Sequence, residues 1–325
     1  MLKFYWLIMH GSSKPAKPKA PRNRTIELEP GEAESLRSSL LFDAHGTIDE
    51  LRNRVICGDS FPVLGQLPSA SFDLLFADPP YNLTKSFGQE TFRELTSDDY
   101  EAWLDSWLSL CIPLLKPTAS IYICGDWRSS SAIQRVGSKY FKLQNRITWE
   151  REKGRGAKAN WKNSAEDIWF FTVSDKFTFN LEAVKLRRKV LAPYKENGKP
   201  KDWKADETGN FRDTHPSNIW TDITIPFWSM PENTDHPTQK PEKLLAKVIL
   251  ASTNPSDLIL DPFAGSGTTS VAAKKLGRDF VAIEADEGYC LIAQKRLERA
   301  EEDISIQGFS EGVFWERNSG QNSPR

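Results

Sequence analysis

Short apolar segments that alternate with helical segments constrain the fold of this chain more than any other feature. Strands are expected at 54–59, 72–77, 119–124, 143–149, 168–173, 258–260 and 280–283. Apolar residues recur at helical spacing between them, at 98–115, 130–138, 241–252, 268–276 and 288–301. Strands that alternate with helices indicate an α/β fold with a doubly wound, mostly parallel sheet.

Charge is unevenly distributed along the 325 residues. The net charge is only -1, but residues 139–162 and 185–204 each carry eight Lys and Arg side chains against two acidic ones. Contact with the phosphates of a nucleic acid requires a basic face rather than a basic protein. The near-neutral total therefore does not exclude a nucleic-acid partner.

The cysteines and the N-terminus indicate a soluble, cytoplasmic protein with no membrane partner. The four cysteines are widely spaced and show no CxxC pairing, which is typical of reduced thiols. Residues 1–9 are apolar but too few to span a membrane, and no clear cleavage site follows them, so a secretory signal is the weaker alternative. Residues 1–35 are expected to form a disordered basic tail, because 11–24 is rich in Pro, Lys and Ser.

A strand, a glycine-containing turn and the start of a helix follow one another at 258–269. Glycine lets a ligand approach the backbone closely. The turn lacks the lysine of a P-loop, and Ser270 stands where a dinucleotide fingerprint has its third glycine or alanine. Asp261 precedes the glycines and Glu284 ends the next strand, which suits a ligand with an amine and a ribose. S-adenosylmethionine has both groups, and a tight turn without a ligand is the alternative.

The segment Asp78-Pro79-Pro80-Tyr81 follows an apolar strand, at the edge where open α/β sheets bind ligands. Two prolines fix the backbone, so the Asp78 carboxylate and the Pro79 carbonyl offer two rigidly placed acceptors. Adenine N6 or cytosine N4, an amine with two hydrogens, suits this pair, and Tyr81 offers a face for stacking. The nitrogen lone pair can then attack a methyl group on a sulfonium in line, without a covalent enzyme intermediate. Because a base inside a duplex cannot reach such a loop, it must be flipped out.

Together these segments resemble the motifs of the DNA amino-methyltransferases, over about Val55 to Arg299. Asp-Pro-Pro-Tyr comes first and Asp-Pro-Phe-Ala-Gly-Ser-Gly last, an order similar to that of the beta class, and His236-Pro237-Thr238-Gln239-Lys240-Pro241 is also typical of it. The resemblance implies a Rossmann-like methyltransferase sheet with an inserted target recognition region, and S-adenosylmethionine as cofactor. The cofactor-binding residues that it implies, with those of the glycine turn, are Asp59, Thr238, Gln239, Lys240, Asp261, Phe263, Ala264, Gly265, Ser266, Gly267, Thr268 and Glu284. Lys240 would pair with the carboxylate of the cofactor.

The resemblance also divides the chain into functional regions. Residues 50–175 would form the catalytic half, 180–235 the target recognition insertion and 236–303 the cofactor-binding half. Residues 304–325 are expected to form a flexible tail, although its aromatic residues (Phe309, Phe314 and Trp315) could dock on the domain. One departure is Ser164-Ala165-Glu166, where many relatives have His-Glu, so no base-pocket histidine is assigned there.

The expected activity is site-specific methylation of adenine N6 in double-stranded DNA, with Asp78, Pro79, Pro80 and Tyr81 as the catalytic loop. Adenine is favoured because an aspartate at the head of the loop usually accompanies it in this family, and cytosine N4 is the alternative. Methyltransferases of structured RNA or of protein glutamine commonly have Asn at this position and lack the permuted order. A DNA-binding module without activity would not need both motifs. A homodimer and a cognate restriction endonuclease are candidate partners, and no metal is expected.

Overall fold

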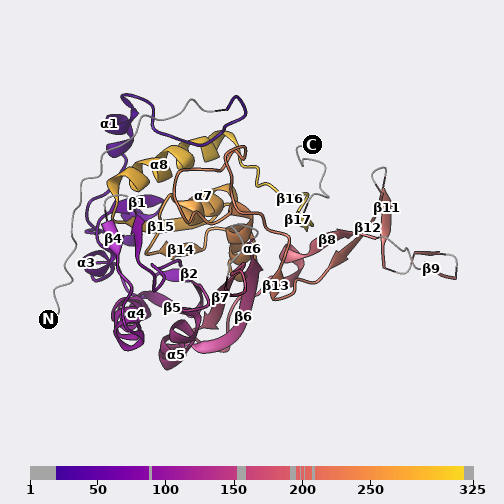
Figure 1. The fold of residues 1–325 in the computed structure, drawn as a ribbon, viewed down its shortest axis with the longest axis horizontal. Coiled ribbons are helices and arrows are strands. Elements are labelled where there is room, and N and C mark those ends of the chain that lie inside the picture. Colours follow the sequence, from indigo (N-terminus) through magenta and orange to yellow (C-terminus); the bar gives the residue numbers. More distant parts are fainter. Residues whose placement is uncertain are drawn as a thin grey trace.

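The computed structural model describes residues 20–87, 90–151, 159–190, 195–197, 199–200, 202–206 and 209–317. An eight-stranded sheet lies at its centre, in the order β1-β15-β14-β2-β5-β7-β6-β13 (Figure 1). Its strands are β1 (Arg54–Cys57), β2 (Phe72–Ala77), β5 (Leu115–Gly125), β6 (Lys142–Glu150), β7 (Ala165–Thr172), β13 (Ile219–Trp220), β14 (Leu258–Asp261) and β15 (Asp279–Glu284). The α/β sheet predicted from the sequence is confirmed.

The sheet is parallel except at β7, which pairs antiparallel with both β5 and β6. Its centre joins distant parts of the chain, because β14 pairs with β2 through Ile259 opposite Leu74. The strands that precede the two predicted ligand loops are therefore neighbours. Since they are parallel, both loops leave the sheet at the same edge.

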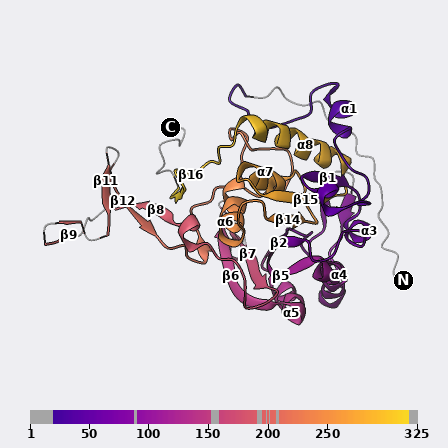
Figure 2. The same cartoon turned by 180° about the vertical axis from the view of Figure 1, so that it is seen from behind.

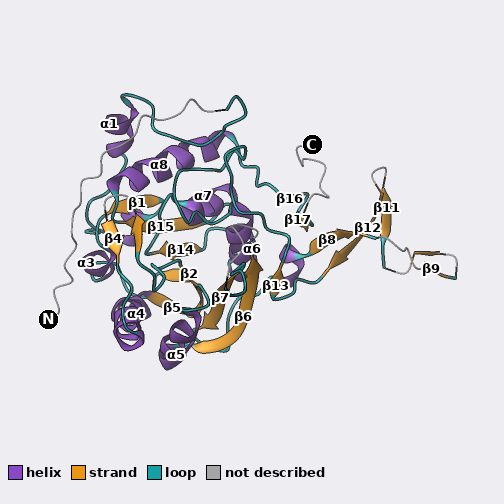
Figure 3. Cartoon of the chain, viewed as in Figure 1, coloured by secondary structure: helices purple, strands orange, loops and turns teal. Residues whose placement is uncertain are grey.

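Helices cover both faces of the sheet (Figure 3). One face packs against α3 (Ser60–Leu64), α4 (Ser97–Cys111) and α5 (Ser130–Tyr140), and the other against α6 (Glu242–Ser252), α7 (Thr268–Lys275) and α8 (Glu287–Glu302). Apolar side chains of each strand alternate between the two cores: Leu74 and Phe76 face one side and Leu75 the other. Two-sided burial explains why the strands are nearly continuous apolar runs.

A basic arm projects from the body in both views (Figure 1, Figure 2). It contains β8 (Leu186–Lys189), β11 (Lys204–Asp206) and β12 (Gly209–Thr214), with the short ribbon β9 (Lys195–Glu196) and β10 (Lys199–Pro200) beyond them. The predicted insertion at 180–235 is not one separate lobe, however. Its end returns to the body, where β13 joins the central sheet and Ile223 and Ile225 enter its core.

Residues 306–315 pack on the rest of the protein, which corrects the expectation of a flexible tail at 304–325 over this part. The strands β16 (Phe309–Ser310) and β17 (Val313–Trp315) extend the sheet of the arm, and β17 pairs parallel with β8. Phe314 is fully buried and Trp315 nearly so. A few apolar residues in a polar stretch have no period, so the sequence offered docking of Phe309, Phe314 and Trp315 only as an alternative to a flexible tail; the structure agrees with that alternative. Residues 318–325 lie outside the described part.

The predicted disordered tail at 1–35 is also wrong in its second half. Ile26 bridges to Thr234 and is buried, and α1 (Glu32–Arg37) packs on α8 through Leu36. An ion pair of 2.6 Å joins Lys295 to Glu32. Residues 1–19 lie outside the described residues.

Within the described ranges, none of the helices combines the length and the apolar character needed to cross a bilayer. All four cysteines are free thiols, in agreement with the sequence prediction. Three of them are buried and Cys57 is half-buried.

Candidate active site

The loop Asp78–Tyr81 leaves the carboxyl end of β2 and is held by its neighbours. The Tyr81 hydroxyl donates to Oδ1 of Asp78 over 2.9 Å. The Tyr100 hydroxyl, from α4, donates to the Pro80 carbonyl over 3.0 Å. The backbone N–H of Asn82 donates to Oγ of Ser129, which follows β5. Hydrogen bonds to Tyr100 of α4 and to Ser129, which follows β5, thus fix the backbone of the loop that carries Asp78.

Lys240 lies directly against this loop. Its Nζ donates to Oδ2 of Asp78 over 2.5 Å and to the Tyr81 hydroxyl over 3.1 Å. Only 5% of the Lys240 side chain is exposed, and the negative charges of Asp78 and Glu166 raise its pKa despite burial, which by itself lowers the pKa. The family resemblance implied that Lys240 pairs with the cofactor carboxylate, and it did not reveal the contact of Lys240 with Asp78.

Glu166 and Arg151 extend the same charged row. Oε2 of Glu166 lies 3.4 Å from Nζ of Lys240, and its Oε1 accepts from the guanidinium of Arg151. Glu166 is 2% exposed. Neither residue was among the predicted site residues. The signal for Glu166 was the departure noted at Ser164-Ala165-Glu166, and Arg151 lies in the basic stretch 139–162.

The glycine turn after β14 is shaped by close contacts. Gly265 has φ +52°, and a β-carbon built on it would lie 2.8 Å from Nε2 of His236. Gly267 has φ +78°, and its β-carbon would lie 2.6 Å from that of Ala293. Both positions therefore require glycine, for conformation and for space.

Two acidic side chains flank this turn. Oδ1 of Asp261 accepts from the N–H of Phe263 over 3.0 Å, and Oε2 of Glu284 accepts from the N–H of Gly265 over 2.8 Å. Burial raises the pKa of Asp261 and of Glu284 to about 7 each, although these hydrogen bonds oppose the shift. Burial lowers the pKa of nearby His236 to about 3, so its ring is neutral at physiological pH. The turn is thus lined by acceptors whose charge changes near neutrality.

Four of the other predicted cofactor residues make contacts with neighbouring protein residues. Gln239 is buried and bonds to Thr234 and to the Glu232 carbonyl, which holds the 232–240 loop together. Thr238 is half-buried beside His236, to which its N–H donates over 3.4 Å. Phe263 packs edge-on against Trp107, with ring centroids 5.0 Å apart. The Ala264 N–H bonds to the Ile283 carbonyl over 2.9 Å.

Asp59 is exposed and caps α3 by accepting from the N–H of Phe61 over 2.9 Å. Ser266 and Thr268 contact Arg296, a fully buried side chain of α8 that also pairs with Glu242. Sequence reasoning did not single out Arg296, because a charged residue on a helix is ordinarily solvent-exposed. Arg296 therefore ties α8 to the glycine turn and to α6.

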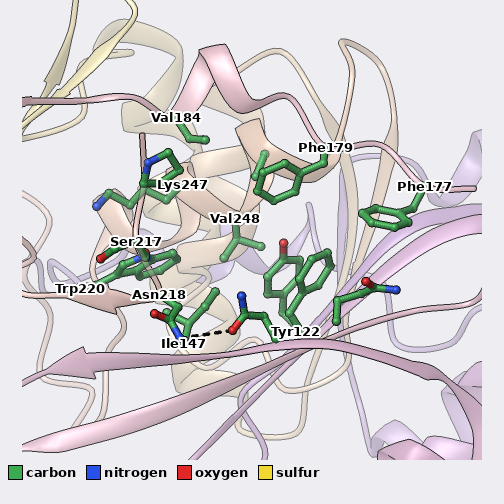
Figure 4. A pocket seen from close by; sticks show the side chains of 15 residues that line it. Tyr122, Ile147, Phe177, Phe179, Val184, Ser217, Asn218, Trp220, Lys247 and Val248 are labelled. Carbon is green, nitrogen blue, oxygen red and sulfur yellow. Dashed lines mark hydrogen bonds between the residues drawn. The ribbon is translucent and has the colours of Figure 1, made fainter. Parts of the chain in front are cut away.

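A separate cavity of about 360 Å³ lies away from this cluster, between β5, β6 and α6 (Figure 4). Aromatic side chains line it (Tyr122, Phe170, Phe177, Phe179 and Trp220), with Asn145 and Asn218 among its polar residues. None of the predicted site residues borders it.

The sheet, the proline loop and the glycine turn define the class of protein, an α/β methyltransferase fold. A sequence model of DNA methylases, described for N6 and N4 methylation, matches residues 72–295, and the chain belongs to this family. It is therefore a DNA methyltransferase, as the resemblance implied.

Relatives and solved structures agree with this assignment. The chain is 35% identical over 255 residues to the DNA adenine methyltransferase YhdJ of Escherichia coli, covering 76% of this chain and 83% of that protein. It is 34% identical over 261 residues to the type II methyltransferase M.HpaI of Haemophilus parainfluenzae, covering 79% and 76%. The crystal structure of an M1.HpyAVI–SAM complex matches 75% of this chain and 98% of its own, at 25% identity and a TM-score of 0.51. The PvuII cytosine-N4-specific methyltransferase, at 18% identity and a TM-score of 0.55 over 77% and 92%, shares the fold.

Proposed function

We propose that this DNA methyltransferase transfers the methyl group of S-adenosylmethionine to N6 of a flipped-out adenine. The observation that carries the proposal is the position of Asp78: its loop leaves the sheet beside the glycine turn, because β2 and β14 are adjacent. The 35% identical relative named as a DNA adenine methyltransferase supports adenine as the base.

The residues around the glycine turn fit S-adenosylmethionine. A β-carbon at Gly265 or Gly267 would clash with His236 or Ala293. Glycine at these positions leaves the backbone of the turn accessible to a ligand. Glu284 offers a carboxylate for ribose hydroxyls, and Asp261 a negative charge for the amine. The further residues that would hold the cofactor are Asp59, Thr238, Gln239, Lys240, Phe263, Ala264, Ser266 and Thr268. When bound, the cofactor supplies a methyl group made electrophilic by the sulfonium.

The catalytic loop positions the base amine. Asp78 and the carbonyl of Pro79 each accept one N–H of the adenine amine, which leaves the nitrogen lone pair directed at the methyl group. Pro80 fixes the backbone, and its carbonyl is already held by Tyr100. Flipping the base out of the duplex costs roughly a few kcal/mol. Stacking of the base on Tyr81 offsets about 1–3 kcal/mol of this cost.

The basic arm is the proposed target recognition region, between the catalytic half at 50–175 and the cofactor-binding half at 236–303. Several of its basic side chains are exposed, among them Arg188, Lys189, Lys195 and Lys204. On the basic stretch that follows β6, the exposed fraction of Trp161 reaches 94%. Phosphate contact by the basic residues and stacking by exposed aromatic residues would hold the duplex across the carboxyl edge.

The remaining partners are proposed on the names of relatives and on the resemblance. Type II methyltransferases such as M.HpaI are among the relatives, which supports a cognate restriction endonuclease acting on the same site. A homodimer and a cytoplasmic location complete the proposal. Light scattering of the purified protein, alone and with a DNA duplex, tests the dimer.

Methylation-aware sequencing of DNA from a methylation-free host tests the proposed activity. Expression of the chain should yield N6-methyladenine at one sequence motif, and the Asp78→Ala variant should yield none. Exclusive N4-methylcytosine would replace adenine by cytosine as the target. If the Asp78→Ala variant still methylates DNA at the wild-type rate, the catalytic role of this loop is wrong.

A further inference from the structure

The antiparallel direction of β7 brings its first residues to the catalytic edge. Asp167 of β7 pairs with Gly125 at the end of β5, and Glu166 pairs with Trp149 near the end of β6. A parallel strand at this place would have put its start at the opposite edge of the sheet. Glu166 therefore lies beside the proline loop although 88 residues separate it from Asp78 in the sequence.

Four charged side chains form an alternating row at this edge, in the order Asp78, Lys240, Glu166, Arg151. Lys240 Nζ is 2.5 Å from Asp78 and 3.4 Å from Glu166, and Arg151 contacts the other carboxylate oxygen of Glu166. Oε2 of Glu166 accepts no hydrogen bond from any residue that the structure describes. Its contact with Lys240 is thus an attraction between charges, made without the geometry of a hydrogen bond.

Burial makes this row sensitive to the loss of any member. Glu166 is 2% exposed and Lys240 5% exposed, so water screens their charges little. A buried charge that loses its partner is strongly destabilised. Glu166 therefore restrains the Lys240 ammonium from one side, while Asp78 and the Tyr81 hydroxyl restrain it from the other.

We propose that Glu166 is a positioning residue for methyl transfer, which holds the ammonium of Lys240 against Asp78. The ammonium helps to fix the orientation of the Asp78 carboxylate, because the Tyr81 hydroxyl donates to one of its oxygens and Lys240 to the other. Asp78 can then accept the adenine N–H with a lone pair that points away from Lys240. This inference rests on the proposed catalytic role of Asp78.

Two substitutions separate a charge effect of Glu166 from a packing effect. Glu166→Gln keeps the shape and removes the charge, whereas Glu166→Asp keeps the charge and shortens the side chain. Loss of an outer partner that orients a metal ligand costs about 10- to 100-fold in activity, and we take the same scale for a group that acts on a catalytic carboxylate. We expect kcat to fall by about that factor in Glu166→Gln and by less in Glu166→Asp, with the KM for DNA unchanged. If Gln supports catalysis better than Asp, the role of Glu166 is packing and the proposal is wrong.

A double-mutant cycle tests whether Glu166 acts through Lys240. In Lys240→Gln, the carboxylates of buried Glu166 and half-buried Asp78 remain without the cation between them, so removing the charge of Glu166 should then no longer lower kcat. We expect Glu166→Gln to lower kcat in the wild-type background and to leave kcat unchanged or higher in the Lys240→Gln background. Equal losses in both backgrounds would show that the two residues act independently.

A matched control and a second readout keep the outcomes distinct. Asp222 pairs with Lys243 and Lys247 in another buried network, at 2.7 Å from each, so Asp222→Asn should lower the melting temperature without lowering kcat. Because Lys240 is also a proposed cofactor residue, calorimetric titration with S-adenosylmethionine sets the saturating cofactor concentration at which kcat of wild type and Glu166→Gln is compared. Wild-type protein that methylates no adenine would contradict the proposed function, whereas active wild type with an equally active Glu166→Gln variant would contradict only this inference.

Discussion

Gly265 and His236 approach so closely that a β-carbon on Gly265 would lie 2.8 Å from Nε2 of the ring. His236 is itself restrained, since its ring meets that of Tyr289 edge-on with centroids 4.5 Å apart. The ring therefore has little freedom to move aside. The glycine turn and the 232–240 loop meet at this contact.

Gly265→Ala should consequently weaken the binding of S-adenosylmethionine by about tenfold or more, since relief of the clash moves either the turn or the imidazole. Gly277→Ala is the matched control. Gly277 also has a positive φ, +68°, but nothing lies within 4 Å of its β-carbon position. The Gly277→Ala substitution should lower the free energy of unfolding by about 1 kcal/mol and leave the affinity for S-adenosylmethionine unchanged. Calorimetric titration compares the two, and equal affinity of Gly265→Ala and wild type would place the cofactor elsewhere.

The two functions of Tyr81 can be separated by substitution. Tyr81→Phe keeps the ring and removes the hydroxyl that donates to Asp78, whereas Tyr81→Ala removes both. We expect kcat to fall only about tenfold or less in Tyr81→Phe, because Lys240 still orients Asp78. In Tyr81→Ala, the loss of stacking should also prevent stable flipping. The fluorescence of 2-aminopurine at the target position reports flipping, and an unchanged signal in Tyr81→Ala would exclude stacking by this residue.

Cofactor affinity should depend on pH near neutrality. Burial raises the pKa of Glu284 to about 7, and the ionised form is the acceptor for ribose hydroxyls. The ionised fraction rises as the pH increases through this value, so binding should tighten between pH 6 and 8, by up to about tenfold if only the ionised form binds. Asp261, with a pKa of about 7, acts in the same direction, whereas His236 stays neutral throughout.

The Glu284→Gln variant provides the comparison for this pH dependence. Its affinity should be weaker at pH 8 and should vary less with pH, the residual slope coming from Asp261. Calorimetric titrations at pH 6, 7 and 8 measure both effects. A wild-type Kd that is constant over this range would show that the carboxylate of Glu284 does not bind the cofactor.

The docked C-terminal segment should contribute strongly to stability. Phe314 is fully buried against the segment 184–186 and under the ammonium of Lys247. Phe314→Ala should lower the free energy of unfolding by about 3–5 kcal/mol. Ile304→Ala, at a residue that is 68% exposed in the same segment, should change it by less than about 0.5 kcal/mol. Urea denaturation followed by circular dichroism compares them, and similar midpoints would mean that this segment is not docked in solution.

The features that the sequence predicted are those that local pattern controls. Leu74-Leu75-Phe76 is apolar on both sides because helices cover both faces of the sheet, so its strand was readable without tertiary information. The proline and glycine loops were found because their backbone requirements restrict residue types. Because β2 and β14 are parallel, both loops were expected at the same edge of the sheet.

The features that the sequence did not reveal depend on contacts between distant segments. Lys240 and Asp78 are 162 residues apart, and nothing local marks either as the partner of the other. Glu166 reaches the site only because β7 runs antiparallel, and an apolar run has the same composition in either direction. Phe314 and Trp315 stand in a polar stretch too short to show a period, so the sequence offered their docking only as an alternative, and their pairing with β8 was found only in the folded chain.

The pairing of β14 with β2 has a consequence for how the protein could be assembled. The two proposed halves meet along the central strands and through the cores on both faces, whereas the arm that links them in sequence projects away from the body (Figure 2). A chain cut between β9 and β10 would therefore leave two fragments that each contain one side of the ligand site. We expect such fragments, produced together in one cell, to reassociate through the central strands, so that fragment complementation would make methylation depend on the meeting of two polypeptides.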